Sequence, residues 1–301
     1  MRIGYVGVGN MGGALARRLL LQVPLMVYDR NPAAVARMTA LGAVACGSLG
    51  EMAGRCEVVL LCLPTSAHVR EALFGDGGLV AGALAGTLFI DQTTGDPAAT
   101  RAMAAELAGV GLELIDAPVS GGPGSAEAGT VAIMVGGSAA QFARALPILG
   151  AISPKVFHAG DVGCGNLVKL VNNLVSATQS LVSLEALTLA AKNGIDPAVA
   201  VEIMQASSGR NFYLENTIPK HILTGQLDAG YALSVLEKDV ALTCRIGGDS
   251  GVPMTFGSVA AGYLRMCVEA LGGDAPGTGI ALMMDRLAGT RVVAGGQLAS
   301  I

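Results

Sequence analysis

Gly7-Val8-Gly9-Asn10-Met11-Gly12 follows a short apolar segment, Arg2 to Val8, and opens a segment with helical spacing, Asn10 to Leu21. The pattern G-x-G-x-x-G in this strand–turn–helix setting binds the pyrophosphate of a dinucleotide. Gly7 permits the tight turn, Gly9 lets the backbone approach the phosphates, and Gly12 lets the helix pack closely on the strand. The first N–H groups of the helix, from Asn10 and Met11 onward, lie at the positive end of its dipole and attract the phosphates. The stretch therefore predicts a nucleotide-binding domain.

The identity of the nucleotide depends on the residues that follow the second predicted strand, Pro24 to Tyr28. Asp29 stands near the position of the acid that binds the adenosine ribose hydroxyls, and a carboxylate there favours NAD because it repels a 2′-phosphate. Arg30 comes next and could instead receive that phosphate, so NADP stays open. A methyltransferase with another adenosine cofactor also has a glycine turn after its first strand. That alternative explains neither the full glycine pattern nor the lysine, Lys169, in a long apolar segment of the second half.

Strand-like and helical segments alternate through the first half of the chain. The predicted strands are 2–8, 24–28, 57–63, 87–91, 113–117, 130–135 and 156–158, and the predicted helices are 10–21, 32–41, 68–74 and 97–109. Continuous apolar strands that alternate with helices predict a doubly wound, mostly parallel α/β sheet.

The pattern changes after about Gly160, where only helical spacing is found. The predicted helices of this half are 166–193, one that starts at Asp196-Pro197, 230–247, 253–271 and a shorter one at 280–287. The glycine-rich stretch from Gly160 to Gly165 marks the break. We therefore expect an α/β domain over residues 1–162 and an all-helical domain over residues 163–301.

The composition excludes several classes of function. Apolar residues make up 52% of the 301 residues and charged residues only 14%, and the net charge is −4 without a basic run, which argues against nucleic acid as a partner. The six cysteines are scattered without CxxC spacing, which predicts reduced thiols in a cytoplasmic protein and no metal site. No uninterrupted apolar run reaches the ~18 residues expected of a membrane helix, and we expect no membrane segment.

The segment with the clearest chemistry starts at Gly163-Cys164-Gly165, a glycine turn that opens a long apolar helix. Lys169 and Asn173 are four residues apart and share one face of that helix. A lysine in an otherwise apolar helix is costly unless something pairs with it or uses it. Desolvation lowers the pKa of a lysine, which suits proton transfer near neutral pH. Lys169 is therefore the candidate proton carrier.

Three further stretches are candidate binding loops. Leu63-Pro64-Thr65-Ser66 and Asp91-Gln92-Thr93-Thr94 follow predicted strands, at the sheet edge where ligands of α/β proteins bind, although ordinary turn and cap chemistry also explains them. In Asp116-Ala117-Pro118-Val119-Ser120-Gly121-Gly122-Pro123, the Ser120 hydroxyl and the N–H groups of Gly121 and Gly122 form a candidate nest for a carboxylate; a plain turn is the alternative.

A fourth stretch, Glu237-Lys238-Asp239, lies in an otherwise apolar helix. Lys238 could reach a substrate or a cofactor, and a surface salt bridge is an equal alternative. The histidines form no triad, and no residues have metal-ligand spacing. Hydride transfer with a nicotinamide needs no metal, but it needs a proton donor for the carbonyl oxygen, a role that Lys169 fits.

Taken together and in this order, these motifs resemble those of the β-hydroxyacid dehydrogenases, which include 3-hydroxyisobutyrate dehydrogenases and tartronate semialdehyde reductases. The resemblance covers nearly the whole chain. It implies a Rossmann-like N-terminal domain joined by a long helix to an all-α, 6-phosphogluconate dehydrogenase-like domain, and a homodimer or homotetramer. It also implies that Lys169 is the general acid/base.

The same resemblance implies the other site residues. Ser120, Gly121 and Gly122 would hold the carboxylate of a small substrate, Asn173 would orient that substrate, and Thr94 and Lys238 would line the cofactor and substrate cleft. Two departures from the family pattern are Cys164 in place of alanine and Tyr231 in place of phenylalanine.

Two alternatives share this fold. Imine reductases look similar overall but usually lack a lysine at this helix position, so Lys169 argues against them. A non-catalytic nucleotide-binding module is disfavoured because Lys169, Asn173 and Lys238 are all present. The substrate, among 3-hydroxyisobutyrate, glycerate with tartronate semialdehyde, threonate and succinic semialdehyde, stays open.

Overall fold

The structure is a computed structural model that describes residues 1–295. The chain divides into two compact units, Met1–Lys169 and Leu170–Ile301. Residues 296–301, the end of the predicted second domain, lie outside the described residues. The predicted domain boundary after residue 162 stays a prediction.

The first unit contains one nine-stranded sheet in the order β3-β2-β1-β4-β5-β6-β8-β7, with β9 also paired to β8. Strands β1 to β6 are parallel, and β8 runs antiparallel to β6 and β7. The strands are β1 Ile3–Val6, β2 Leu25–Tyr28, β3 Val44–Ala45, β4 Val58–Leu61, β5 Leu88–Asp91, β6 Glu113–Asp116, β7 Val119–Ser120, β8 Ala132–Gly136 and β9 Val156–Gly160. The strand order reverses between β1 and β4, which is where open α/β sheets bind their ligands.

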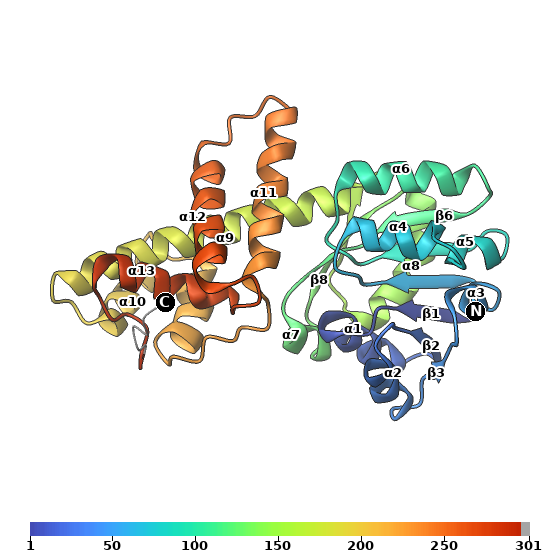
Figure 1. Cartoon of the computed structure of the whole chain (residues 1–301), viewed down its shortest axis with the longest axis horizontal. Coiled ribbons are helices and arrows are strands. Elements are labelled where there is room, and N and C mark those ends of the chain that lie inside the picture. Colours follow the sequence, from blue (N-terminus) through green and yellow to red (C-terminus); the bar gives the residue numbers. More distant parts are fainter. Residues whose placement is uncertain (296–301) are drawn as a thin grey trace. The chain divides into compact units, whose positions relative to one another are not determined.

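Helices cover both faces of this sheet, and each face has its own apolar core. The helices of the unit are α1 Asn10–Leu20, α2 Pro32–Thr39, α3 Leu49–Ala53, α4 Ser66–Phe74, α5 Leu79–Gly82, α6 Pro97–Ala108, α7 Pro123–Glu127 and α8 Ala139–Ile152. In Figure 1, α1 and α2 lie on one side of the sheet and α4 and α6 on the other.

The two cores follow from the period of two along each strand. In β4, Val58 and Leu60 belong to the core of α1, α2 and α8, whereas Val59 and Leu61 belong to the core of α3, α4, α5 and α6. Because successive side chains of a strand point to opposite faces, an all-apolar strand supplies both cores at once. The prediction of a doubly wound sheet is confirmed.

The second unit is helical. Its elements are the greater part of α9 Cys164–Lys192, then α10 Pro197–Gln205, the π-helix η1 Tyr213–Ile222, α11 Leu233–Asp249, α12 Thr255–Leu271, the short 3₁₀-helix η2 Gly277–Gly279 and α13 Ile280–Ala288. Ala177, Leu184 and Leu187 of α9 are part of the core that joins these helices. The prediction of a helical C-terminal half is confirmed for the described residues.

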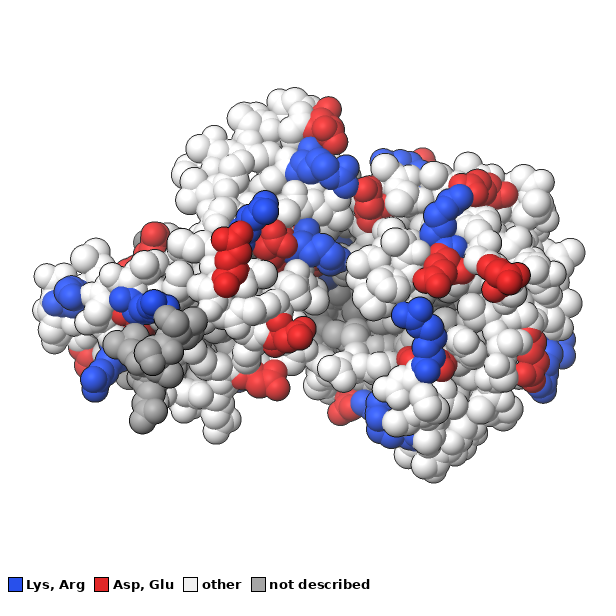
Figure 2. Space-filling view, viewed as in Figure 1, with Lys and Arg blue, Asp and Glu red and all other residues white. Residues whose placement is uncertain are grey.

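Helix α9 is the one helix among the described residues that is long and apolar enough to cross a membrane, with a mean hydropathy of 1.3 over its most apolar 18-residue window, of which 33% is buried. The core helix of a globular protein passes the same test. Figure 2 shows Lys and Arg interspersed with Asp and Glu among large uncharged areas on the face in view, as the charged fraction of 14% leads one to expect.

Candidate active site

The glycine turn lies between β1 and α1, at the carboxyl end of β1. Gly7 has a φ of +86°, which L side chains rarely adopt. A Cβ at Gly7 would lie 2.3 Å from the carbonyl oxygen of Cys62 after β4, and one at Gly12 would lie 2.0 Å from that of Gly7. A Cβ at Gly9 would have no atom within 4 Å, and no side chain caps the start of α1. The N–H groups of that first turn therefore face open space beside Gly9, which fits a pyrophosphate.

Asp29 follows β2 and is hydrogen-bonded to the glycine turn itself. Its Oδ2 accepts a 2.8 Å bond from the N–H of Val8, and its Oδ1 accepts one of 2.8 Å from the N–H of Asn31. The carboxylate is thus fixed beside the turn, where an adenosine ribose bound at this turn would lie. Arg30 is mostly exposed and lies 4.0 Å from Glu71, a surface contact of the kind that contributes little to stability.

The loops after β4 and β5 are bonded to each other. The N–H of Leu63 donates a 3.0 Å bond to Thr93 Oγ1, and the N–H of Thr93 donates a 2.9 Å bond to the Asp91 carboxylate. Pro64 and Thr94 stand next to these two residues. The structure therefore brings together the predicted loops after β1, β2, β4 and β5 at one edge of the sheet.

Asp91 and Asp116 end neighbouring strands and are both buried. Burial raises the pKa of Asp91 to about 7, and the nearby Asp116 carboxylate adds to the rise, whereas hydrogen bonds from Thr93 oppose it. Burial also raises the pKa of Asp116, and the N–H groups that it binds act in the opposite direction. Two buried carboxyl groups side by side are a feature that the sequence pattern did not single out.

The stretch from Asp116 to Pro123 separates into two parts with different contacts. Asp116 Oδ1 and Oδ2 accept bonds of 2.6 Å each from the N–H groups of Gly163 and Asn166 at the start of α9. Ser120 ends β7, Gly121 follows with a φ of +130°, and Gly122 precedes α7 without a side-chain cap. Ser120, Gly121 and Gly122 thus lie in the turn between β7 and α7, and their role as a nest for a carboxylate stays a prediction.

Lys169 lies within the second turn of α9 and is half-buried. Asn166, one turn before it, is fully buried, and its side chain accepts a 2.9 Å bond from the N–H of Gly95 in the loop after β5. Lys169 is therefore carried by a helix whose start is bonded to the same sheet edge as the glycine turn.

Asn173 and Lys238 meet through Asp239. The Asn173 amide donates a 2.7 Å bond to Asp239 Oδ2, and Lys238 Nζ lies 3.0 Å from Asp239 Oδ1. Asp239 is 1% exposed, and its backbone carbonyl accepts a 2.6 Å bond from Thr243 Oγ1. The contact of Lys238 with Asp239 joins it to a buried carboxylate that is next to it in sequence, and its predicted contact with a substrate or a cofactor stays a prediction.

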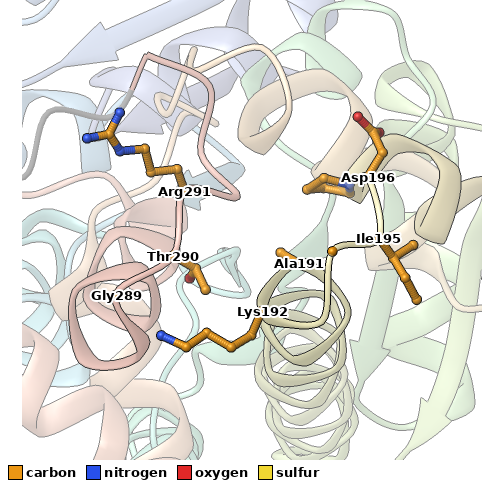
Figure 3. Close-up of a pocket in the computed structure, with 9 residues that line it drawn as sticks. Ala191, Lys192, Ile195, Asp196, Gly289, Thr290 and Arg291 are labelled. Carbon is orange, nitrogen blue, oxygen red and sulfur yellow. The ribbon is translucent and has the colours of Figure 1, made fainter.

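A separate pocket of about 500 Å³ lies at the C-terminal ends of α9 and α13 (Figure 3). Its polar groups hold the helix ends: Lys192 Nζ donates to the carbonyl oxygen of Ala288, Thr290 Oγ1 donates to Asp285, and Asp196 caps α10. None of the predicted site residues lines it, and we assign it no ligand. The described residues contain no cluster of three or more His, Cys, Asp or Glu side chains placed to bind a metal.

Both halves of the chain match family models of related NAD(P)-binding dehydrogenases. A family model for the NAD binding domain of 6-phosphogluconate dehydrogenase matches residues 2–160. A second one, described as NAD-binding of NADP-dependent 3-hydroxyisobutyrate dehydrogenase, matches residues 163–284.

Individual proteins align over most of the chain. A 2-(hydroxymethyl)glutarate dehydrogenase of Eubacterium barkeri is 36% identical and covers 86% of this chain and 87% of its own length. A 3-hydroxyisobutyrate dehydrogenase of Pseudomonas aeruginosa is 39% identical, with 80% and 83% covered. Among solved structures, a Mycobacterium tuberculosis 3-hydroxyisobutyrate dehydrogenase with L-serine has a TM-score of 0.86 at 28% identity, with 94% and 99% covered.

Proposed function

Because the chain belongs to the β-hydroxyacid dehydrogenases, NAD(P)-dependent oxidoreductases that act on the CH–OH group of small hydroxy acids, we propose that Lys169 is its general acid/base. In the oxidation of the alcohol, the Lys169 amine takes the proton of the hydroxyl; in the reverse reaction, its ammonium returns a proton to the carbonyl oxygen. A nicotinamide held by the loops at the carboxyl ends of the strands would supply the hydride chemistry at the carbon that bears this oxygen. The observation that carries the proposal is the attachment of the Lys169 helix to the loop after β5 and to Asp116 at the end of β6.

The carboxylate of the substrate is held, in this proposal, by the Ser120 hydroxyl and the N–H groups of Gly121 and Gly122. Asn173 orients the substrate, and Lys238 contributes a positive charge to the substrate and the cofactor. Support for the last two roles comes from their shared contact with Asp239, which fixes the direction of the Asn173 amide and keeps Lys238 close to it.

NAD(P) is held by the loops at the carboxyl ends of the parallel strands. The residues that we assign to it are Gly7, Gly9, Asn10, Met11, Gly12, Asp29, Arg30, Leu63, Pro64, Thr94 and Lys238. We propose NAD as the preferred form, because the Asp29 carboxylate is fixed beside the glycine turn and repels a 2′-phosphate there. The exposed Arg30, next to Asp29, could bind a 2′-phosphate and leaves NADP as the second choice.

The names of the relatives suggest one substrate class. 3-Hydroxyisobutyrate, 2-(hydroxymethyl)glutarate and L-serine all have a CH₂OH group on the carbon that bears a carboxylate, and they differ in the third substituent. We propose that substrates of this chain share this core, a 2-substituted 3-hydroxypropanoate. Oxidation then removes two electrons and two protons from CH₂OH, one proton leaving with the electrons as hydride, and yields the semialdehyde.

A spectrophotometric panel tests this function. The three compounds named above and glycerate are each offered with NAD and with NADP, and formation of reduced cofactor is followed. Isobutyrate, which lacks the hydroxyl, and isobutanol, which lacks the carboxylate, are the controls. We expect turnover with at least one member of the class, no turnover with isobutyrate, and a higher kcat/KM with NAD. Absence of turnover across the whole panel would contradict the proposal.

We further propose that the chain assembles as a homodimer or homotetramer through α9. A stripe of apolar side chains on α9 is 44–66% exposed: Val168, Val171, Val175, Val182 and Leu189. Their spacing of three, four, seven and seven residues is that of a coiled-coil seam. Such a stripe is self-complementary across a two-fold axis. The exposed Asn172, Ser176 and Glu185 on the same helix favour a protein partner over lipid.

We place the enzyme in the cytoplasm, because all six cysteines are free thiols.

A further inference from the structure

Asp116 and Asn166 form a buried link between the start of α9 and the edge of the sheet. We propose that these two residues are positioning residues that hold the proton carrier Lys169 in place relative to the cofactor loop after β5. The inference rests on the proposed function of Lys169. Neither residue is assigned contact with substrate or cofactor.

The Asp116 carboxylate replaces the local cap that a helix normally has. Its two oxygens accept 2.6 Å bonds from the N–H groups of Gly163 and Asn166, which are among the N–H groups that a helix start leaves without partners. A carboxylate there also lies at the positive end of the helix dipole. Because Asp116 is the last residue of β6 and about fifty residues away in sequence, the cap ties the helix to the sheet.

The Asn166 side chain extends the link to the loop after β5 and to α6. Its Oδ1 accepts a 2.9 Å bond from the N–H of Gly95, and its Nδ2 donates a 3.2 Å bond to Thr100 Oγ1 of α6. Gly95 directly follows Thr94, which we assign to the cofactor. The backbone N–H, Oδ1 and Nδ2 of Asn166 therefore all make hydrogen bonds, and the residue is fully buried.

The link leaves little freedom for the helix to shift. A Cβ at Gly165 would lie 2.3 Å from the carbonyl oxygen of Met134 and 2.9 Å from Asp116 Oδ2, so the helix backbone contacts β8 and the carboxylate directly. Lys169 follows Asn166 by three residues, a rise of about 4.5 Å along the helix axis. A change at Asp116 or Asn166 is therefore transmitted to Lys169 with little loss, because a helix is stiff over one turn.

A purely structural role is the competing explanation, and Asp196 provides the matched control. Its carboxylate also caps a helix: its Oδ1 accepts bonds from the N–H groups of Ala198 and Val199 at the start of α10. However, Asp196 is a local cap, two residues before Ala198. Asp196→Asn is expected to leave kcat and its pH profile unchanged, with at most a small loss of Tm because asparagine caps a helix about as well as aspartate.

The experiment measures kcat, KM, the Kd of NADH, the pH profile of kcat and Tm for Asp116→Asn, Asn166→Ala and Asp196→Asn. A misplacement of about 1 Å costs about 100-fold in rate, so we expect kcat to fall about 10- to 100-fold in the first two variants and the Kd of NADH to change little. We also expect the limb of the pH profile that reports Lys169 to be displaced. If Asp116→Asn does not fold, Asn166→Ala, which leaves both backbone bonds to Asp116 in place, carries the same test.

Double variants separate this inference from the function on which it rests. In a Lys169→Ala background, Asp116→Asn and Asn166→Ala are expected to cause no further loss of kcat, because the group that they position is absent. An equal loss in both backgrounds, or variants that behave like Asp196→Asn, would overturn the positioning role. Full turnover of Lys169→Ala alone would instead overturn the proposed function.

Discussion

The side-chain amide of Asn173 donates a 2.7 Å hydrogen bond to the buried carboxylate of Asp239. A carboxylate accepts and does not donate, so this contact fixes which end of the amide is Nδ2. The Asn173 carbonyl oxygen therefore points away from Asp239, where Asn172 Nδ2 lies 3.3 Å from it. Because Lys238 Nζ lies 3.0 Å from the other oxygen of Asp239, one carboxylate orients both polar residues of the second unit to which we assign substrate contacts.

We predict that Asp239→Asn lowers kcat/KM about 10- to 100-fold, because a hydrogen bond to a charged group contributes about 1.5–3 kcal/mol. The substitution keeps the size of the side chain but removes the charge that holds Lys238 and lets the Asn173 amide turn. Steady-state kinetics measure the effect, and far-UV circular dichroism checks the fold. An unchanged kcat/KM in a folded variant would show that Asp239 has no part in substrate recognition.

Gly9→Ala is predicted to weaken cofactor binding while leaving the fold intact. A Cβ at residue 9 meets no atom of the protein within 4 Å, but it occupies the space that we assign to the pyrophosphate. A displaced phosphate loses charge-assisted hydrogen bonds of about 1.5–3 kcal/mol each, so the Kd of NADH rises about tenfold or more. Fluorescence titration of NADH measures it in a chain that has no tryptophan.

Gly150→Ala in α8 is the matched control for that measurement, because a Cβ there also meets no atom within 4 Å. It leaves the Kd of NADH unchanged and has no steric cost. Equal Kd values for Gly9→Ala and the parent protein would place the pyrophosphate elsewhere.

Asp91→Asn is predicted to stabilise the protein more at pH 8 than at pH 5. Burial raises the pKa of Asp91 from 3.8 to about 7, so between these values the folded protein holds a proton that the unfolded chain has released. The stability contributed by this proton is fully present below pH 3.8 and is lost as the pH rises through about 7. An asparagine has no such loss.

The measurement for Asp91→Asn is Tm at the two pH values, relative to the parent protein at the same pH. Asp76→Asn, a change at an exposed carboxylate, is the control and is expected to have the same small effect at both. A gain in Tm for Asp91→Asn that is equal at pH 5 and pH 8 would mean that Asp91 is ionised in the folded protein throughout this range.

The double variant Val175→Glu with Val182→Glu is predicted to yield smaller particles than the parent protein. Both valines are at least half exposed on α9, and two like charges in the centre of a two-fold seam repel their copies. Light scattering coupled to size-exclusion chromatography measures the mass. A parent protein that is monomeric, or that binds neutral lipid vesicles through this face, would contradict assembly through α9.

The glycine turn, the apolar strands and the long helix could be predicted because each is a local pattern: a fixed motif, a period of two, or a period of 3.6. Helix α8 and the π-helix η1 were not predicted, and both contain an interior proline, Pro147 and Pro219, which normally ends a helix. In η1 the wider turn is evident from the bond of Leu223 N–H to the carbonyl oxygen of Ile218, five residues earlier.

The candidate site, too, could be predicted only where its signals are local in sequence. Gly7, Asp29 and Lys169 could be chosen from motif and chemistry alone. The contacts of Asp116 with Asn166 and of Asn173 with Asp239 join residues 50 and 66 positions apart, and only the folded chain brings them together. For that reason the sequence pattern places Asp116 with the substrate loop, whereas its carboxylate binds the start of α9.

The most direct test of the central claim is the turnover of Lys169→Ala and Lys169→Arg with the best substrate of the panel. General acid/base catalysis contributes about 100- to 10,000-fold, and arginine keeps the charge but cannot release its proton near neutral pH. We predict that both variants fold, bind NADH with the Kd of the parent protein and lose turnover by about this factor. Turnover within about twofold of the parent in either variant would show that Lys169 does not carry the proton.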